Sequence, residues 1–439
     1  MDERALAPTL NAPSDANAAP DGSADEPGQA DLFGMPVAPA SASSGSPASS
    51  AQNAPAPRSD TPSARAGASR PAADTASLWV DDDSDGDNDG DADEATEPDA
   101  PEPPARKRRA RDVLAVEPSA DVTAIAATLP PNVHLGTSTW SFPGWNGIVY
   151  GDDYSNSKLS RDGLTAYGAH PLLRTVSIDR SFYAPLPVTD YLRYAQQVPD
   201  HFRFIVKAPA LVTDATVRAE RGEPVSANPC FLNAQLATDE FVRPCLDGLG
   251  AKAGALVFQF SPLPDDMLAD PAAFIERLAA FLGSLPPLPK EPGGPCYAVE
   301  IRDGCLLTPR FIRTLKAAGV RYCVGVHARM PDPLRQAAAL ALLDADGDGP
   351  AGPLIVRWSL HGGFRYEQAK AKYEPFDRLV DEDPPTRRAL AELAARYAIA
   401  GQPVLIAVNN KAEGSAPLTC IELARLIAEA IERMKNDGA

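Results

Sequence analysis

Eight short apolar segments alternate with longer amphipathic segments after Pro131, and this alternation constrains the fold more than any other feature of the chain. Apolar runs of this length predict buried strands of a parallel sheet, and the segments between them predict helices that cross over the sheet. Eight strands with intervening helices fit a closed (β/α)8 barrel of the TIM type. The strands are expected at residues 133–139, 175–181, 203–209, 255–261, 297–303, 321–327, 354–361 and 404–410.

Helices are expected between these strands. An open, doubly wound sheet alternates strands and helices in the same way. However, no GxGxxG fingerprint follows any of the runs and no P-loop is present, which weakens that alternative. We therefore expect an α/β fold with a single TIM-type barrel over residues 132–436. The expected helices are residues 188–197, 234–249, 271–282, 309–318, 386–400 and 416–435.

The first 131 residues have a different composition, dominated by Ala, Pro, Ser, Gly and Asp with few aromatic or branched residues. So little apolar surface cannot offset the conformational entropy lost on ordering, so residues 1–131 are expected to form a disordered tail. The tail contains an acidic block at residues 81–99 and a basic block at residues 106–111.

The overall charge of −18 argues against nucleic-acid binding, because phosphate binding requires concentrated positive charge. The basic block at 106–111 is the exception and keeps a nucleic-acid or partner interaction as an alternative to a solvated linker. No signal sequence and no apolar run of about 18 residues is visible, so we expect no membrane contact. The 6 cysteines show no CxxC or metal spacing and fit free thiols in a reducing cytoplasm.

Polar side chains occur where each predicted strand ends. The C-terminal ends of barrel strands open on one face, where ligands bind, so these residues are expected to converge on one pocket. Charged side chains such as Lys207, Glu300 and Arg302 are costly to bury without partners. Chance is therefore a poor explanation for their positions at the ends of buried strands. The candidate ligand-binding residues are Lys207, Arg302, Gln259, Asn409, Asn410, Trp140, Tyr183 and Thr137.

These residue types fit an enzyme that acts on a small anionic ligand, phosphorylated or sugar-like, by general acid/base chemistry. Lys207 and Arg302 would bind the anion, while the amide side chains would orient hydroxyl groups. Glu300 or Asp179 would be the general base or acid, with His361 as its partner. Alternatively, strand alternation places Glu300 and Arg302 on the same side, where they would pair and hold the geometry of the site. The aromatic residues would stack on the ligand or pack the mouth of the barrel.

Other functions fit the same pattern. A non-catalytic barrel that binds a ligand or a partner would need similar residues, and the fold does not decide between the two. A divalent metal held by Asp179, Glu300, His327 and His361 is a further alternative. No HxH or HExxH spacing supports it, so no cofactor is predicted.

Several short motifs carry a family resemblance when they are taken together and in order. They are residues 135–145 (LGTSTWSFPGW), 181–183 (SFY), 204–207 (FIVK), 257–259 (VFQ), 298–302 (AVEIR), 360–362 (LHG) and 408–410 (VNN). On these motifs the region from 132 to 430 resembles the domain of unknown function 72 (YecE-like) family. The resemblance implies a TIM-barrel-like fold and a bacterial or archaeal cytosolic protein, and it implies no established activity. The recurrent residues of that family map here to Gly136, Thr137, Trp140, Trp145, Phe182, Tyr183, Lys207, Gln259, Glu300, Arg302, His361, Gly362, Asn409 and Asn410.

The chain departs from the family pattern at several of these motifs. Ser177 and Asp179 stand where the family usually has Glu and Asn, and Asp214 and Asp303 stand where it usually has His. An amide is thereby replaced by a carboxylate and two imidazoles are lost, so the groups offered to a ligand differ from those of the family.

Overall fold

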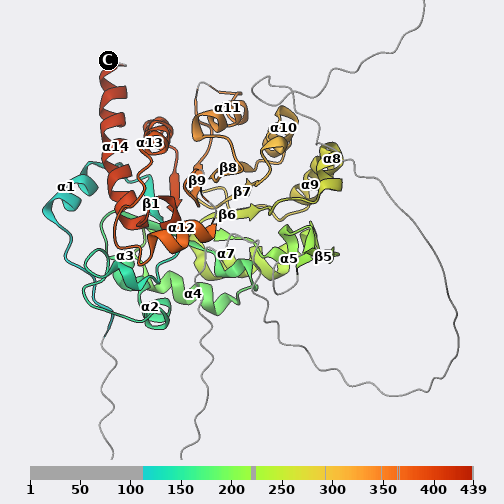
Figure 1. The fold of residues 1–439 in the computed structure, drawn as a ribbon. Coiled ribbons are helices and arrows are strands. Elements are labelled where there is room, and N and C mark those ends of the chain that lie inside the picture. The colour runs from blue at the N-terminus through green and yellow to red at the C-terminus, as the bar shows by residue number, and fades with distance from the viewer. Residues whose placement is uncertain are drawn as a thin grey trace, which may run out of the picture.

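A computed structural model describes residues 112–437, except residues 219–223, 292, 348, 363 and 365. Its centre is a closed barrel of parallel strands in the order β1-β10-β9-β8-β7-β6-β3-β2 (Figure 1). Each strand begins within or next to one of the eight apolar runs, so the predicted TIM-type barrel is confirmed. The strands are β1 (Val133–Thr137), β2 (Leu173–Ile178), β3 (Arg203–Lys207), β6 (Ala253–Gln259), β7 (Cys296–Glu300), β8 (Arg321–Val326), β9 (Leu354–Trp358) and β10 (Val404–Val408).

Helices surround the barrel, and all six predicted helical segments are present. The segment 234–249 is divided by a π-helical turn at Thr238–Val242. The helices are α1 (Ala120–Thr128), α2 (Asn156–Asp162), α3 (Leu164–Gly168), α4 (Val188–Gln197), α5 (Ala210–Thr213), α6 (Ala234–Ala237), α7 (Arg243–Leu249), α8 (Asp265–Ala269), α9 (Pro271–Gly283), α10 (Pro309–Ala317), α11 (Pro333–Leu343), α12 (Tyr366–Tyr373), α13 (Pro384–Ile399) and α14 (Ala416–Asp437).

Four of the outer helices, α9, α10, α11 and α13, begin with the same local sequence signal. A capping side chain accepts a hydrogen bond from a backbone N–H of the first turn, and a proline follows directly after the cap. The cap satisfies an N–H group that has no partner within the helix, and proline is preorganised for the first helical position. The capping residues are Asp270, Thr308, Asp332 and Asp383.

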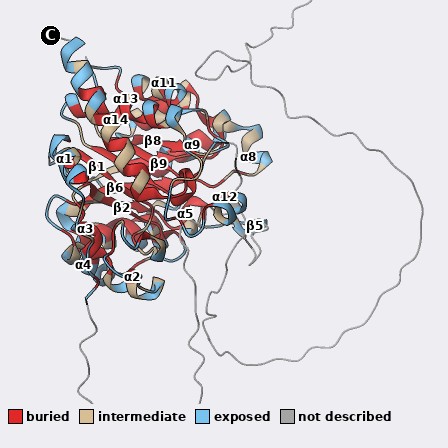
Figure 2. Cartoon of the chain, turned by 60° about the vertical axis from the view of Figure 1, so that its left-hand side comes forward, coloured by how far each residue is buried: buried red, intermediate tan, exposed pale blue. Residues whose placement is uncertain are grey.

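The apolar core has two layers separated by the wall of the barrel. Large aliphatic and aromatic side chains fill the space between the strands and the helices, whose outer faces are exposed (Figure 2). A second, smaller layer fills the middle of the barrel, because alternate strand residues point inward. This inner layer consists of Ile205, Ala255, Val257, Ala298, Cys323, Ile355, Leu405 and Ala407.

The folded part begins earlier than the expected boundary at residue 131. Helix α1 lies within the last part of the predicted tail and packs against α14. The Arg174 guanidinium donates hydrogen bonds to the carbonyl oxygens of Ala126 (3.1 Å) and Pro130 (3.4 Å). These contacts make residues 112–131 part of the barrel domain. Residues 1–111, with the acidic block 81–99 and the basic block 106–111, lie outside the described residues.

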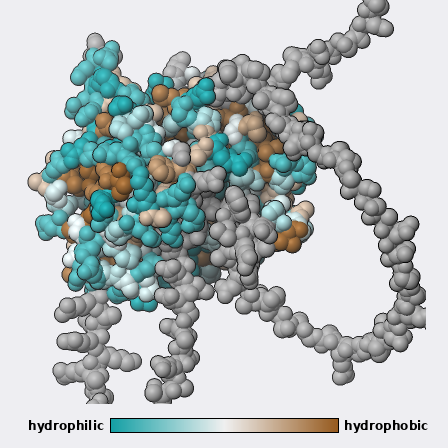
Figure 3. Space-filling view, viewed as in Figure 1, coloured by the Kyte–Doolittle hydropathy of each residue, from teal (hydrophilic) through white to brown (hydrophobic). Residues whose placement is uncertain are grey.

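Apolar side chains gather at several places on the face in Figure 3, one of which is the antiparallel hairpin formed by β4 (Thr216–Arg218) and β5 (Pro224–Ala227). Val217 and Val225 are exposed there. Within the described residues, no helix is both long and apolar enough to cross a membrane. All six cysteines are free thiols, of which Cys305 is exposed.

Candidate functional site

Charged and polar side chains occupy the inward positions directly above the apolar layer of the barrel. Lys207, Gln259, Glu300 and Arg357 each follow a member of that layer by two residues, so they point into the barrel near the C-terminal ends of their strands. Gln259 and Glu300 are register partners on β6 and β7. All four residues are at most 1% exposed. The same alternation that makes the middle of the barrel apolar therefore makes its C-terminal end charged.

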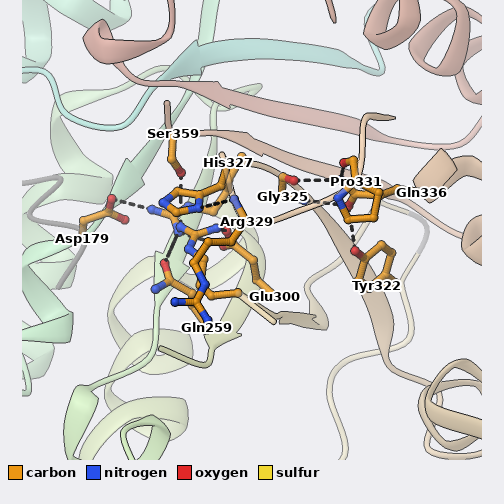
Figure 4. A network of polar contacts seen from close by, with 12 residues as sticks. Asp179, Gln259, Glu300, Tyr322, Gly325, His327, Arg329, Pro331, Gln336 and Ser359 are labelled. Carbon is orange, nitrogen blue, oxygen red and sulfur yellow. Dashed lines mark hydrogen bonds and ion pairs between the residues drawn. The ribbon is translucent and has the colours of Figure 1, made fainter. Parts of the chain in front are cut away.

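Arg357 is the centre of the contacts in this region. Its Nη1 donates to Gln259 Oε1 at 2.7 Å and to Glu300 Oε2 at 2.8 Å, and its Nη2 donates to Asp179 Oδ2 at 2.7 Å. One guanidinium from β9 thus connects side chains from β6, β7 and the end of β2. Figure 4 shows Asp179, Gln259 and Glu300 converging from different strands.

Arg302 forms the second half of the network. Its Nη1 donates to Glu300 Oε1, and its Nη2 donates to Gln259 Oε1 and to Ser359 Oγ, both at 3.3 Å. Glu300 is therefore bound by both arginines, one on each carboxylate oxygen. We refer to Asp179, Gln259, Glu300, Arg302 and Arg357 as the mouth cluster.

Both carboxylates of the mouth cluster are engaged within the barrel. Ser177 Oγ donates to Asp179 Oδ1, while Arg357 occupies the other oxygen of Asp179. Glu300 is completely buried between Arg302 and Arg357. In this arrangement the carboxylates hold the guanidinium groups in place, as the pairing of Glu300 and Arg302 along one strand suggested. Their predicted acid/base roles stay predictions.

A glycine on β8 makes room for the mouth cluster. Gly325 is the register partner of Arg357, and a Cβ atom at this position would lie 3.3 Å from both Arg302 Nη1 and Glu300 Oε1. Contacts that close are tighter than most Cβ contacts, so any larger residue would require the ion pair to shift slightly. The sequence around β8 shows this glycine, but only the structure reveals what it accommodates.

Lys207 approaches the cluster from β3 and is also nearly fully buried. Its Nζ lies 3.7 Å from the centroid of the Phe182 ring, a cation–π contact. The hydroxyl of Ser181 donates to the carbonyl oxygen of Lys207 at 2.7 Å. The predicted Ser-Phe-Tyr motif thus positions Lys207 through two of its three residues.

The rim beside β7 and β8 is held by a second set of contacts. Asp303 Oδ2 accepts from the Leu263 N–H at 2.8 Å, and its Oδ1 accepts from Arg329 Nη2 at 2.6 Å. Gln336 of α11 donates to the carbonyl oxygens of Gly325 (2.8 Å) and Pro331 (2.7 Å), so it ties the end of β8 to the following loop (Figure 4). These contacts fix the loop that carries His327 and Arg329.

The residues at which the chain departs from the family pattern form specific contacts in this structure. Asp179 binds Arg357, Ser177 binds Asp179, and Asp303 caps a backbone N–H while it pairs with Arg329. Asp214 follows α5 and is 5% exposed. The changed residues therefore belong to the same region as the motifs, and three of them form charge-assisted contacts there.

Several predicted ligand-binding residues lie outside the mouth cluster. Thr137 Oγ1 is within 2.8 Å of the Tyr167 hydroxyl, on the helical side of the barrel wall. Trp140 packs edge-on against Tyr194 of α4, with ring centroids 5.2 Å apart. Tyr183 is 43% exposed. The structure thus gives Thr137 and Trp140 packing contacts, which the sequence left open for Trp140.

The two asparagines after β10 are buried and hold the local backbone. Asn409 Oδ1 accepts from the Lys411 N–H at 2.9 Å, and Asn410 Oδ1 accepts from the Ala416 N–H at 2.9 Å and from Trp145 Nε1 at 3.2 Å. With Thr137 and Trp145, they line a small hollow between the ends of β1 and β10. Trp145 is therefore a packing residue that orients Asn410.

His361 follows β9, and its contacts are with residues outside the mouth cluster. It is half-buried, its Nδ1 is 2.7 Å from the Gly362 carbonyl oxygen, and its ring lies edge-on to Phe364. The sequence placed His361 at this end of the barrel, and its role as the acid/base partner of Glu300 or Asp179 stays a prediction.

Burial keeps the Cys323 thiol and the Tyr322 hydroxyl, both near the cluster, in their neutral forms. The Cys323 thiol lies in the apolar layer beneath it, and burial raises its pKa well above the usual value, with a further increase from Glu300. Burial also raises the pKa of Tyr322 well above 10. Neither group supplies a thiolate or phenolate nucleophile at neutral pH.

Arg357 and Ser359 were not selected as site residues from the sequence. Arg357 was visible as a charge within the apolar run 354–361, which is the signal that could have identified it. In the described part of the chain, no three His, Cys, Asp or Glu side chains are grouped so that they could hold a metal ion. The four residues considered for a metal therefore do not form such a group.

The fold and the site together define a TIM-barrel protein with a buried charged cluster at the C-terminal end of its strands. Residues 134–438 match the family model described as "Protein of unknown function DUF72", so the chain belongs to the DUF72 family. The curated proteins contain no match to it.

Solved structures of the family resemble this chain. A DUF72 family protein from Thermotoga maritima aligns with a TM-score of 0.46 and 18% identity, covering 67% of this chain and 98% of that one. A DUF72 family protein from Enterococcus faecalis aligns with a TM-score of 0.41 and 14% identity, covering 68% and 97%. A glucosidase from Croceicoccus marinus aligns with a TM-score of 0.30 and 15% identity, covering 66% and 65%.

Proposed function

We propose that the C-terminal mouth of the barrel binds a small anionic ligand, and that Lys207, Arg302 and Arg357 recognise it. The observation that carries the proposal is that two guanidinium groups, Arg302 and Arg357, both bind Glu300 and Gln259 at this end of the barrel. Lys207 is buried at the corresponding inward position of β3. That place is the end of the barrel at which TIM-barrel proteins bind their ligands.

The energetic cost of the mouth cluster supports a functional origin. A buried ion-pair network is often no more stabilising than apolar residues of the same volume, because each charge loses its hydration. The layer directly below shows that apolar side chains fill this barrel well. A stable barrel therefore does not need these charges, and ligand binding gives a reason for their presence.

The geometry of the cations favours a phosphate or carboxylate group. A guanidinium is a planar fork that binds such groups through two parallel hydrogen bonds, and the carboxylates of Glu300 and Asp179 hold both forks in fixed positions. The proposed ligand class is a small phosphorylated or carboxylated metabolite, with Gln259 beside it as a partner for a hydroxyl group. We further propose that Glu300, Asp179 and His361 carry out acid/base chemistry on the bound ligand.

The proposal is tested by calorimetry on the full chain with inorganic phosphate, glucose 6-phosphate and glucose. The parent is expected to bind the two phosphates and not glucose. Lys207→Met and Arg302→Lys are expected to weaken phosphate binding by about tenfold or more, since a charge-assisted hydrogen bond contributes about 1.5–3 kcal/mol. Arg193→Met, on the exposed side of α4, is the matched control. Equal affinities in all variants, or binding of glucose alone, would remove the basis for an anion site.

Turnover is a separate readout with the same samples. An enzyme would convert a bound phosphorylated compound into a new species visible by phosphorus NMR, whereas a binding protein would return it unchanged. Unchanged ligand together with tight, Lys207-dependent binding would refute the acid/base step and leave the anion site standing.

A further inference from the structure

The two carboxylates of the mouth cluster, Asp179 and Glu300, are held to different degrees. Glu300 is the last residue of β7, is completely buried, and is bound by both guanidinium groups, one on each carboxylate oxygen. Asp179 lies one residue beyond the end of β2 and is bound by the Arg357 guanidinium and the Ser177 hydroxyl. At 4% exposed, it is also the most exposed member of the mouth cluster. Asp179 is therefore the carboxylate that leaves its arginine at the lower cost.

Asp179 is bound to the nitrogen of Arg357 that would otherwise meet a ligand. Arg357 Nη2 donates to Asp179 Oδ2 at 2.7 Å, while its Nη1 donates to Gln259 and Glu300 inside the cluster. A guanidinium binds a carboxylate or a phosphate through its N–H groups. A ligand anion and the Asp179 carboxylate are therefore alternative partners for the same nitrogen.

The position of the Asp179 carboxylate also adjoins the buried lysine of the site. β2 and β3 are parallel neighbours with Ile178 opposite Val206, so Asp179 and Lys207 are the next residues along their two strands. An anion in the place of the Asp179 carboxylate would therefore lie between the Arg357 guanidinium and the strand end that carries Lys207. Two of the cations proposed to recognise the ligand would then act on the same anionic group.

We propose that Asp179 is an internal competitor of the ligand: the anionic group of the ligand displaces the Asp179 carboxylate from Arg357 Nη2, and Asp179 thereby sets the affinity and selectivity of the site. This inference rests on the anion-binding function proposed for the mouth. A competitor that is tethered beside Arg357 acts at a high effective concentration, so only an anion that binds better than this carboxylate is retained. Displacement also releases Asp179 from its ion pair, which the acid/base role proposed for it requires.

Calorimetry of the full chain with inorganic phosphate tests the proposal through a gain in affinity. Asp179→Asn keeps the shape of the side chain and an oxygen acceptor for Arg357, and it removes the charge that competes. The variant is expected to bind phosphate about tenfold more tightly than the parent, as a hydrogen bond to a charged group contributes about that ratio or more. Ser177→Ala keeps the charge of Asp179 and removes the hydroxyl that holds it, so a smaller gain of about threefold is expected.

Asp303→Asn is the matched control, because it makes the same change of charge at the same end of the barrel. Asp303 is as buried as Asp179, but its described partners are the Leu263 N–H and the Arg329 guanidinium. Its replacement is expected to change phosphate affinity by less than about twofold, as is usual for a residue outside the network concerned. Circular dichroism and the unfolding midpoint verify that each variant is folded.

The outcomes separate this inference from the proposed function. Equal gains in Asp179→Asn and Asp303→Asn would indicate a general effect of charge and overturn the role of Asp179. An affinity in Asp179→Asn that is equal to or weaker than that of the parent, together with weaker binding in Lys207→Met, would also overturn it and leave the anion site standing. If phosphate bound neither the parent nor Asp179→Asn, the proposed anion site would fall together with this inference.

Discussion

Replacement of Arg357 by Met tests whether the mouth cluster has the energetics that its geometry indicates. The side chain of Arg357 is almost completely buried and forms close contacts with Asp179, Glu300 and Gln259. Hydrogen bonds to charged groups contribute about 1.5–3 kcal/mol each, but contacts that share one network are not additive. Removal of one partner from a buried ion pair typically costs about 3–5 kcal/mol, because the remaining charge is buried without compensation. We therefore expect Arg357→Met to lower the free energy of unfolding by about 3–5 kcal/mol.

The matched variant is Arg357→Met combined with Asp179→Asn. This double replacement removes one cation and one anion and leaves the Glu300–Arg302 pair in balance. It is expected to be more stable than Arg357→Met alone by about 1–3 kcal/mol, since no excess carboxylate stays buried. Guanidinium chloride unfolding of the full chain, followed by fluorescence and circular dichroism, measures both values. A loss below about 1 kcal/mol for Arg357→Met, or a double variant less stable than the single one, would contradict the reasoning.

Three further predictions concern the rest of the barrel. A chain that begins at residue 132 is expected to lose about 3–5 kcal/mol relative to one that begins at residue 112, because it lacks the buried side chains of Val113, Val122, Ala126 and Leu129; equal unfolding midpoints would refute this. Asp344→Ala is expected to cost about 3 kcal/mol in the same assay, since it leaves Arg321 buried without its partner at 2.7 Å; Asp346→Ala, which is exposed, is the control. Burial lowers the pKa of His170 to about 4, as it does for His134, so unfolded imidazoles take up protons below about 6.5 that the folded ones refuse. The free energy of unfolding is therefore expected to fall between pH 6.5 and 4, and the fall is expected to be smaller in His170→Asn. The same pH dependence in the parent and in this variant would contradict the prediction.

The fold was predictable because its signal is distributed along the whole chain. Each of the eight strands coincides with an apolar run, and the helices with strong amphipathic patterns, such as 188–197 and 309–318, begin at the expected residues. Helix α11 was missed because its sequence, PLRQAAALALL, has weak contrast between its faces. Helix α1 was missed because it follows low-complexity sequence and has only two buried side chains, so its stability comes from α14 and Arg174.

The site was predictable in location and less so in its contacts. The positions at the strand ends identified Lys207, Gln259, Glu300 and Arg302, which the closed barrel brings to one end. The charge of Arg357 within the apolar run 354–361 marks it as a candidate, but the sequence does not show that its guanidinium connects three strands and does not reach solvent. Contacts of this kind depend on which strands are neighbours across the barrel.

The apolar layer in the middle of the barrel separates the two ends of the barrel electrostatically. Seven of its eight side chains are hydrocarbon, and the eighth is the Cys323 thiol, which burial keeps protonated. Moving a charge through such a medium is strongly unfavourable, so ions do not reach the mouth cluster along the barrel axis from the N-terminal end. Charge substitutions at the N-terminal end are therefore expected to leave the ion pairs of the mouth cluster unchanged.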